Sequence, residues 1–313
     1  GHPQGRRLTR PQTKYAEWRK AELHCHLDGA LRPATAEELA GRPLRLTAPA
    51  SCASQAEYIS YFDDQISVLQ TEAALERCSY ELCLDSAAEK IDYLEVRWAP
   101  RLHLREGLTV EAVIGAVLRG LEAAPITAVA IVCAMRGHAV AENVELARTA
   151  GTFAGLGVVG FDLAGDELRY PAAPHRPAFA AAQAAGLRLS CHAGEAGEPE
   201  SVEEALDLGV ERIAHGVIGA RSPRVVERIR AAGVVLDVCP TANLRCRAVP
   251  SLAAHPLPAL VRAGVRCTIS TDSRTVAGTT LSKEFELAET EMGMTEDELL
   301  RCNLTAYEAR FGR

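Results

Sequence analysis

The chain lacks the features that mark membrane, nucleic-acid-binding and secreted proteins. No apolar stretch reaches the roughly 20 residues that a membrane-spanning helix needs. The N-terminal run GHPQGRRLTRPQTK is polar throughout, unlike a signal peptide. The basic residues are scattered and the formal net charge is −7, so no surface that follows a phosphate backbone is expected. We therefore expect a cytoplasmic protein with no nucleic-acid and no membrane partner.

Other absences narrow the fold and the kind of site. The 10 cysteines have no framework spacing and no C-x-x-C pair, which predicts reduced, buried thiols and excludes the commonest zinc ribbons. Neither a GxGxxG loop nor a P-loop occurs, although an open doubly wound sheet normally needs such a phosphate-binding turn. Any metal must therefore be held by ligands other than paired cysteines.

What is present is an ordinary globular composition with a regular βα alternation. Hydrophobic residues make up 48% and charged residues 24% of the chain. Eight short, β-rich apolar runs cover residues 21–29, 93–100, 126–135, 158–167, 187–195, 211–216, 234–243 and 266–273. Helix-like segments, several opened by Thr or Ser with Glu close behind, separate them. The pattern favours an α/β fold, a closed (β/α)₈ TIM-type barrel, over an open sheet. With no linker or internal repeat, residues 1–313 are predicted to form one domain.

The longest connection joins the first two runs, over residues 31–91. Helix-like pieces near 55–69 and 72–90 predict a helical lid insertion after the first strand, followed by a barrel helix. Tyr58, Tyr61 and Phe62 are candidates for touching a ligand from this lid. The alternative for these aromatic residues is packing between helices.

Most of the runs end in a histidine, an acid or an amide followed by glycine or proline. In a (β/α)₈ barrel the carboxyl ends of the strands form the active-site face, so these polar ends should converge. His24 and His26 are two apart and point to the same side of the first strand. His192, His215 and Asp272 end the fifth, sixth and eighth runs. Neutral imidazoles with a carboxylate suit Zn²⁺, which can make water nucleophilic near neutral pH.

Two of these polar residues also suit proton chemistry. Glu195 follows His192 by three residues across a glycine turn, where it could act as a proton donor beside a metal, or simply stabilise a helix N-terminus. His215 could stabilise charge in a reaction intermediate, or be an ordinary core histidine. Four further histidines are expected to be structural or exposed, and they are His103, His138, His175 and His255.

The ordered motifs resemble those of the adenosine deaminase family. KAELHCHLDGALRP, YLEVRWAP, GFDLAGDE, CHAGE, ERIAHGV, VCPTAN and STDS occur in that family's order and span nearly the whole chain. The resemblance implies a (β/α)₈ barrel that holds one zinc ion and deaminates a purine nucleoside, a small-molecule partner. It assigns zinc binding to four residues, His24, His26, His192 and Asp272.

The resemblance also implies the roles of the other site residues. Asp272 would accept a proton from the attacking water and Glu195 would protonate purine N1. His215 would orient the nucleophile. The backbone amide of Gly165 would meet the purine edge, and Asp28 of HLDG would meet the 5′ side of the sugar, which favours nucleosides over free bases.

One residue departs from the family pattern. Adenosine deaminases usually read TDD where this chain reads Thr271, Asp272, Ser273. The second acid of the family contacts purine N7, and the Ser273 hydroxyl could still donate there. The departure leaves open a second substrate, 6-aminodeoxyfutalosine, an adenosine analogue enlarged at its 5′ end that a bacterial subgroup deaminates in menaquinone synthesis.

Two rival classes make different demands on the sequence. Binuclear amidohydrolases also begin with H-x-H but need a lysine at the end of the fourth strand, and the lysines, none of them near GFDLAGDE, are Lys14, Lys20, Lys90 and Lys283. A barrel that only binds a ligand would be expected to have lost a metal ligand or the acid. The chain keeps all of them.

Overall fold

A computed structural model describes residues 13–312, so the polar N-terminal run and the outer ends of the predicted domain lie largely outside the described residues. Eight strands, each parallel to the next, follow one another in chain order around the molecule. They are β1 (Lys20–His26), β2 (Ile91–Trp98), β3 (Thr127–Met135), β4 (Val158–Ala164), β5 (Arg188–Ala193), β6 (Arg212–His215), β7 (Val235–Val238) and β8 (Arg266–Ile269).

Backbone hydrogen bonds between β1 and the residues after β8 bring the two ends of the sheet together. The His26 amide donates to the Asp272 carbonyl at 2.6 Å, and the Asp272 amide donates to the His24 carbonyl at 3.0 Å. The predicted (β/α)₈ barrel is confirmed. Its strands are buried along most of their length because both faces of a parallel sheet are covered.

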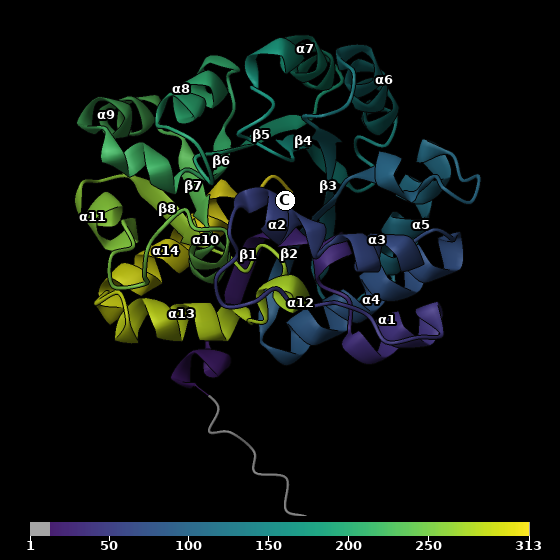
Figure 1. The fold of residues 1–313 in the computed structure, drawn as a ribbon, viewed down its shortest axis with the longest axis horizontal. Coiled ribbons are helices and arrows are strands. Elements are labelled where there is room, and N and C mark those ends of the chain that lie inside the picture. The colour runs from purple at the N-terminus through teal and green to yellow at the C-terminus, as the bar shows by residue number, and fades with distance from the viewer. Residues whose placement is uncertain (1–12, 313) are drawn as a thin grey trace, which may run out of the picture.

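An outer layer of helices surrounds the strands (Figure 1). Its members are α4 (Glu72–Ala88), α5 (Val110–Glu122), α6 (Val140–Gly151), α7 (Arg176–Ala184), α8 (Glu200–Asp207), α9 (Pro223–Ala232), α11 (Leu257–Arg262), α13 (Leu281–Thr290) and α14 (Glu296–Ala309). Side-chain oxygens of Thr71, Thr109, Ser222, Thr280 and Thr295 cap five of them, in keeping with the predicted Thr and Ser helix starts.

Shorter elements complete the loops. The helices α10 (Pro240–Arg245) and α12 (Arg274–Ala277) follow β7 and β8. The predicted run 234–243 therefore ends earlier as a strand, because Pro240 cannot continue a ladder and instead begins a helix. The 3₁₀ turns are η1 (Lys14–Glu17), η2 (Leu27–Gly29), η3 (Pro100–His103), η4 (Ala173–His175) and η5 (Val217–Arg221).

The connection between β1 and β2 contains α1 (Pro33–Ala40), α2 (Gln55–Ser60) and α3 (Asp63–Val68) before α4. The helix expected near 55–69 is thus two helices, since the chain tightens into i→i+3 hydrogen bonds at Tyr61 and Phe62. Helix α1 was not predicted, although Pro33 at its start and a left-handed Gly41 at its end are standard boundary signals. In Figure 1, α2 lies in front of the strands, near the middle of the barrel.

None of the helices between residues 13 and 312 is both long and apolar enough to cross a bilayer.

Candidate active site

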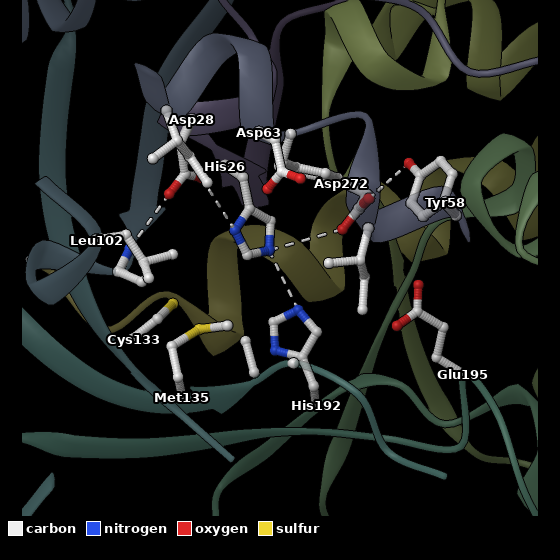
Figure 2. A pocket seen from close by; sticks show the side chains of 16 residues that line it. His26, Asp28, Tyr58, Asp63, Leu102, Cys133, Met135, His192, Glu195 and Asp272 are labelled. Atoms are coloured by element: carbon white, nitrogen blue, oxygen red, sulfur yellow. Dashed lines mark hydrogen bonds and ion pairs between the residues drawn. The ribbon is translucent and has the colours of Figure 1, made fainter. Parts of the chain in front are cut away.

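The predicted metal ligands meet at the carboxyl ends of the strands. His24 and His26 come from β1, His192 from β5, and Asp272 from the residues just after β8. One ligand atom from each of these four side chains lies within 4.8 Å of the other three. Figure 2 shows three of them, His26, His192 and Asp272, facing one another across the pocket. Residues up to 248 positions apart in the sequence are therefore brought to one point by barrel closure.

The contacts within this cluster leave donor atoms available for an ion. His24 Nε2 lies 3.0 Å from Asp272 Oδ1, and His26 Nε2 lies 3.1 Å from His192 Nε2. Both ring nitrogens of the fully buried His24 lack a hydrogen-bond partner, and such orphaned buried atoms need an explanation. Burial lowers the pKa values of His24 and His192, so both imidazoles are neutral at pH 7 and keep a lone pair. This donor set fits a metal ion.

A buried acid that was not predicted from the sequence orients His192. Asp162 Oδ2 on β4 lies 2.7 Å from His192 Nδ1, and Arg97 Nη1 lies 3.3 Å from the same oxygen. Burial opposes ionisation of Asp162, but His192 and Arg97 outweigh it and hold the pKa of Asp162 well below its usual value. A charge inside the apolar run 158–164 is the signal that could have revealed this support for a metal ligand.

Glu195 and His215 lie side by side next to the metal cluster. Burial, followed by the negative charge of Asp272, raises the pKa of Glu195 to about 7, which suits a proton donor near neutral pH. Burial lowers the pKa of His215 to about 4, so this imidazole is neutral. Asn243 Nδ2 lies 3.0 Å from His215 Nδ1 and can donate to it. The ring proton then sits on His215 Nε2, which lies 3.6 Å from Glu195 Oε1.

Unusual backbone geometry positions these side chains. His215 and Asp272 have positive φ angles of 71° and 64°, which non-glycine residues rarely adopt and which are often found at functional sites. The turn before Glu195 needs glycine, because a Cβ on Gly194 would lie 2.7 Å from Val202. The Glu167 carboxylate accepts the backbone amides of residues 194, 195 and 196 at 2.6–3.1 Å. The turn is therefore rigid.

A cavity of about 230 Å³ opens beside the cluster. Asp28 and Gly165, predicted to contact substrate, both line it, together with apolar side chains that sequence reasoning did not identify, namely Ile59, Ile66, Ala99, Leu102, Cys133 and Met135. His103, which was expected to be a structural or exposed residue, is buried with its Nε2 3.5 Å from Asp28 Oδ2. This contact helps to hold the pKa of Asp28 well below its usual value, against the opposing effect of burial.

Ser273 and the aromatic residues of the β1–β2 connection differ in whether they line the cavity. Tyr58 and Phe62 line the cavity, whereas Tyr61 does not. Ser273 is fully buried and is also not among the lining residues; its hydroxyl lies 2.8 Å from the Tyr58 hydroxyl. A direct contact between Ser273 and substrate thus remains a prediction. Figure 2 shows Tyr58 joined to Asp272 by a hydrogen bond.

The structure offers no support for a lysine-bridged pair of metals. Strand β4 ends at Ala164, followed by Gly165, where such a site needs lysine. The Lys20 ammonium lies at the opposite end of the barrel, where it donates to the carbonyls of Tyr15 and Trp18 at 2.7 and 2.8 Å. The fold and the clustered side chains therefore define a barrel hydrolase with one candidate metal centre among residues 13–312.

Comparison with known proteins identifies the family. The model of the adenosine deaminase family matches residues 19–312, and the chain belongs to this family of hydrolytic deaminases. An adenosine deaminase from Shewanella halifaxensis is 36% identical over 320 residues, which covers 95% of each chain. One from Shewanella pealeana is 37% identical and covers 90% of this chain and 91% of the relative. The resemblance predicted from the motifs is confirmed.

Solved structures share the fold. An adenine deaminase from Arthrobacter aurescens is 26% identical, with a TM-score of 0.84 and coverage of 94% of each chain. An Arabidopsis N6-mAMP deaminase superposes with a TM-score of 0.87 over 96% of this chain and 95% of its own, at 24% identity. These neighbours share the fold of this chain, and their names refer to different substrates.

Proposed function

We propose that this protein is a zinc-dependent enzyme that hydrolyses the 6-amino group of a purine nucleoside of the adenosine type, with release of ammonia. One observation carries the proposal. Three imidazoles and the Asp272 carboxylate meet at one point, and beside them Glu195 has a pKa near 7. A barrel that only binds a ligand would have no need for this combination of metal ligands and proton donor.

The residues that would hold zinc are the four of the cluster, His24, His26, His192 and Asp272. When bound, zinc lowers the pKa of water to about 7 and so supplies a nucleophile at neutral pH. Thiolates, the ligands of structural zinc ribbons, are absent from the cluster. The nitrogen and oxygen donors are those of catalytic zinc sites.

The side chains around this centre divide the proton chemistry. Glu195, protonated at neutral pH, donates a proton to purine N1 as the ring loses its aromatic character. Asp272 accepts the proton of the attacking water. His215, neutral with a proton on Nε2, donates a hydrogen bond to the nucleophile and stabilises the developing charge. The Gly165 amide meets the purine edge. The 6-amino group takes up the proton that Asp272 accepted from water, and it leaves as ammonia.

Asp28 supports a nucleoside over a free base, because its carboxylate could accept a hydrogen bond from a sugar hydroxyl. The described lining of the cavity includes Asp28 and Asp63 but no lysine or arginine, which favours a substrate without a negatively charged 5′ group. We propose that α2 and α3 form a lid over the site, since the segment contributes Tyr58 from α2, Phe62 from the turn between the helices and Asp63 from α3 to the lining.

A turnover assay tests the proposal directly. Zinc-loaded protein should convert adenosine or deoxyadenosine to the 6-oxo nucleoside with one ammonia released per product. A series that varies only the 5′ substituent, up to 6-aminodeoxyfutalosine, ranks the two candidate substrates by kcat/KM. Stoichiometric zinc without turnover of any member of the series would instead support a ligand-binding barrel.

A further inference from the structure

Helix α2 buries polar side chains where a helix would normally bury apolar ones. Only two of its six residues are buried, Gln55 at 2% exposure and Tyr58 at 1%, and both are polar. They are three positions apart, so they lie on the same face of the helix. An apolar residue at either position could fill the same space without the cost of burying polar atoms. The buried face of α2 therefore needs an explanation beyond packing.

Each of these two side chains hydrogen-bonds one of the two acids in the proposed mechanism. Gln55 Nε2 donates to Glu195 Oε2 at 2.6 Å, and the Tyr58 hydroxyl donates to Asp272 Oδ2 at 2.9 Å. The Gln55 amide cannot be reversed, because its Oε1 accepts the backbone amide of Glu167 at 3.0 Å. The donor end must then face Glu195.

In both cases α2 contacts the carboxylate oxygen that points away from the chemistry. Asp272 Oδ1, the other oxygen, lies 3.0 Å from His24 Nε2. Glu195 Oε1, the other oxygen of that acid, lies 3.6 Å from His215 Nε2. One oxygen of each acid is thus fixed by the helix, and the second is left to face the metal cluster or the substrate.

We propose that Gln55 and Tyr58 are positioning residues, by which α2 sets the orientation of both acids and so completes the active site. The inference rests on the proposed function, since it takes Glu195 as the proton donor and Asp272 as a metal ligand and proton acceptor. Tyr58 acts on the metal site through Asp272, and Gln55 acts on proton transfer through Glu195. The helix that lies over the carboxyl end of the barrel is therefore also the helix that orients the two acids.

The two residues should give different signatures when the polar atoms are removed. Gln55→Leu should lower kcat about tenfold to a hundredfold, the effect of losing one hydrogen bond to a charged or charge-developing group. Its KM for adenosine should change less than threefold and its zinc affinity should not change. Tyr58→Phe should weaken zinc binding about tenfold, measured as faster release to a chelator, because Asp272 Oδ2 loses one of its two hydroxyl donors and keeps only Ser273, at 3.1 Å.

Ser60→Ala is the matched control, since the Ser60 hydroxyl donates to the Glu57 carbonyl within the same helix. It should match the wild type in kcat and zinc retention. Gln55→Asn keeps the amide on a side chain that is one methylene shorter, and it should behave like Gln55→Leu because the amide no longer reaches Glu195. Circular dichroism and melting temperature are recorded for every variant to exclude misfolding. Wild-type kcat with Gln55→Leu, together with wild-type zinc release with Tyr58→Phe, would overturn the inference. An inactive wild-type protein would instead refute the proposed function, and the zinc-release arm would still test Tyr58.

Discussion

The two ends of the barrel interior both bury charge, but they treat it differently. Toward the amino ends of the strands, Arg212 pairs with Glu95 and lies 3.0 Å from Asp237 through its Nε. Glu95 also accepts the Tyr93 hydroxyl, and Asp237 accepts the Thr268 hydroxyl. Arg212, Glu95 and Asp237 thus each have a partner of opposite sign, as buried ions in a stable core require.

At the carboxyl ends, several polar atoms are buried without a hydrogen-bond partner. Both nitrogens of His24 and the Nε2 of His215 lack hydrogen bonds, and His215 and Asp272 have strained backbones. Such a cluster costs free energy in the absence of a ligand. The lower cluster is Arg212, Glu95 and Asp237, and the upper cluster is His24, His215 and Asp272 with their neighbours. The comparison indicates that the lower cluster contributes to the fold and the upper cluster to chemistry. Arg97 and Asp162 connect the two, because Arg97 also lies 3.7 Å from Asp237.

The largest effect is expected for Glu195→Gln in the upper cluster. The amide keeps the size of the side chain but cannot supply an acidic proton, so kcat should fall by roughly 10²–10⁴-fold. Zinc content and melting temperature should stay close to those of the wild type. Glu198→Gln, an exposed site on the same loop, is the control, and comparable activity of the two variants would remove Glu195 from the mechanism.

Arg212→Met should show the opposite pattern. It leaves Glu95 and Asp237 buried without their main cation, so the free energy of unfolding should fall by about 3–5 kcal/mol. Activity per folded molecule, measured well below the melting temperature, should persist. Arg230→Met removes an exposed pair with Glu227 and should change stability by less than about 1 kcal/mol. Equal melting temperatures for both variants would contradict a stabilising lower cluster.

Another buried acid, Glu284, predicts a pH dependence of stability. Burial raises its pKa to about 7, although hydrogen bonds from Thr241 and Thr279 oppose the rise. A raised folded-state pKa means that the contribution is complete below about pH 4.5 and is lost as pH rises through 7. Relative to Glu284→Gln, the wild type should lose about 3 kcal/mol of unfolding free energy between pH 5 and 8. A difference between the two proteins that does not vary with pH would show that Glu284 is ionised in the fold.

Asp162→Asn tests the connection between the clusters and should have the smallest effect. The amide oxygen can still accept from His192 Nδ1, but the charge that raises the basicity of this ligand is lost. Zinc affinity should fall roughly tenfold to a hundredfold, the usual result of changing a partner of a metal ligand. Competition with a chromophoric chelator measures it. Unchanged affinity would mean that His192 is oriented by the strand alone.

The sequence predicted those parts of the site that local pattern encodes. A His-x-His pair at a strand end, the glycine turn before Glu195 and the polar residues that end most runs depend on neighbours along the chain, and the barrel places them at one face. The supporting contacts of Asp162, Gln55 and His103 could not be predicted in this way. Their partners are 30 to 140 positions away. Asp162 is marked locally only as a charge inside an apolar run, and nothing in the local sequence distinguishes Gln55 and His103 from ordinary helix or core residues.

From its sequence alone, this chain is determined to be an eight-stranded barrel of a known deaminase family, because alternation, caps and strand-end motifs are local properties. The tertiary structure decided which buried acids are paired and which are poised for chemistry. It also divided the predicted helix at 55–69 in two, and it turned Gln55 and Tyr58 toward the two acids. Hydrogen bonds across the barrel depend on distances of a few tenths of an ångström, which only the assembled fold sets.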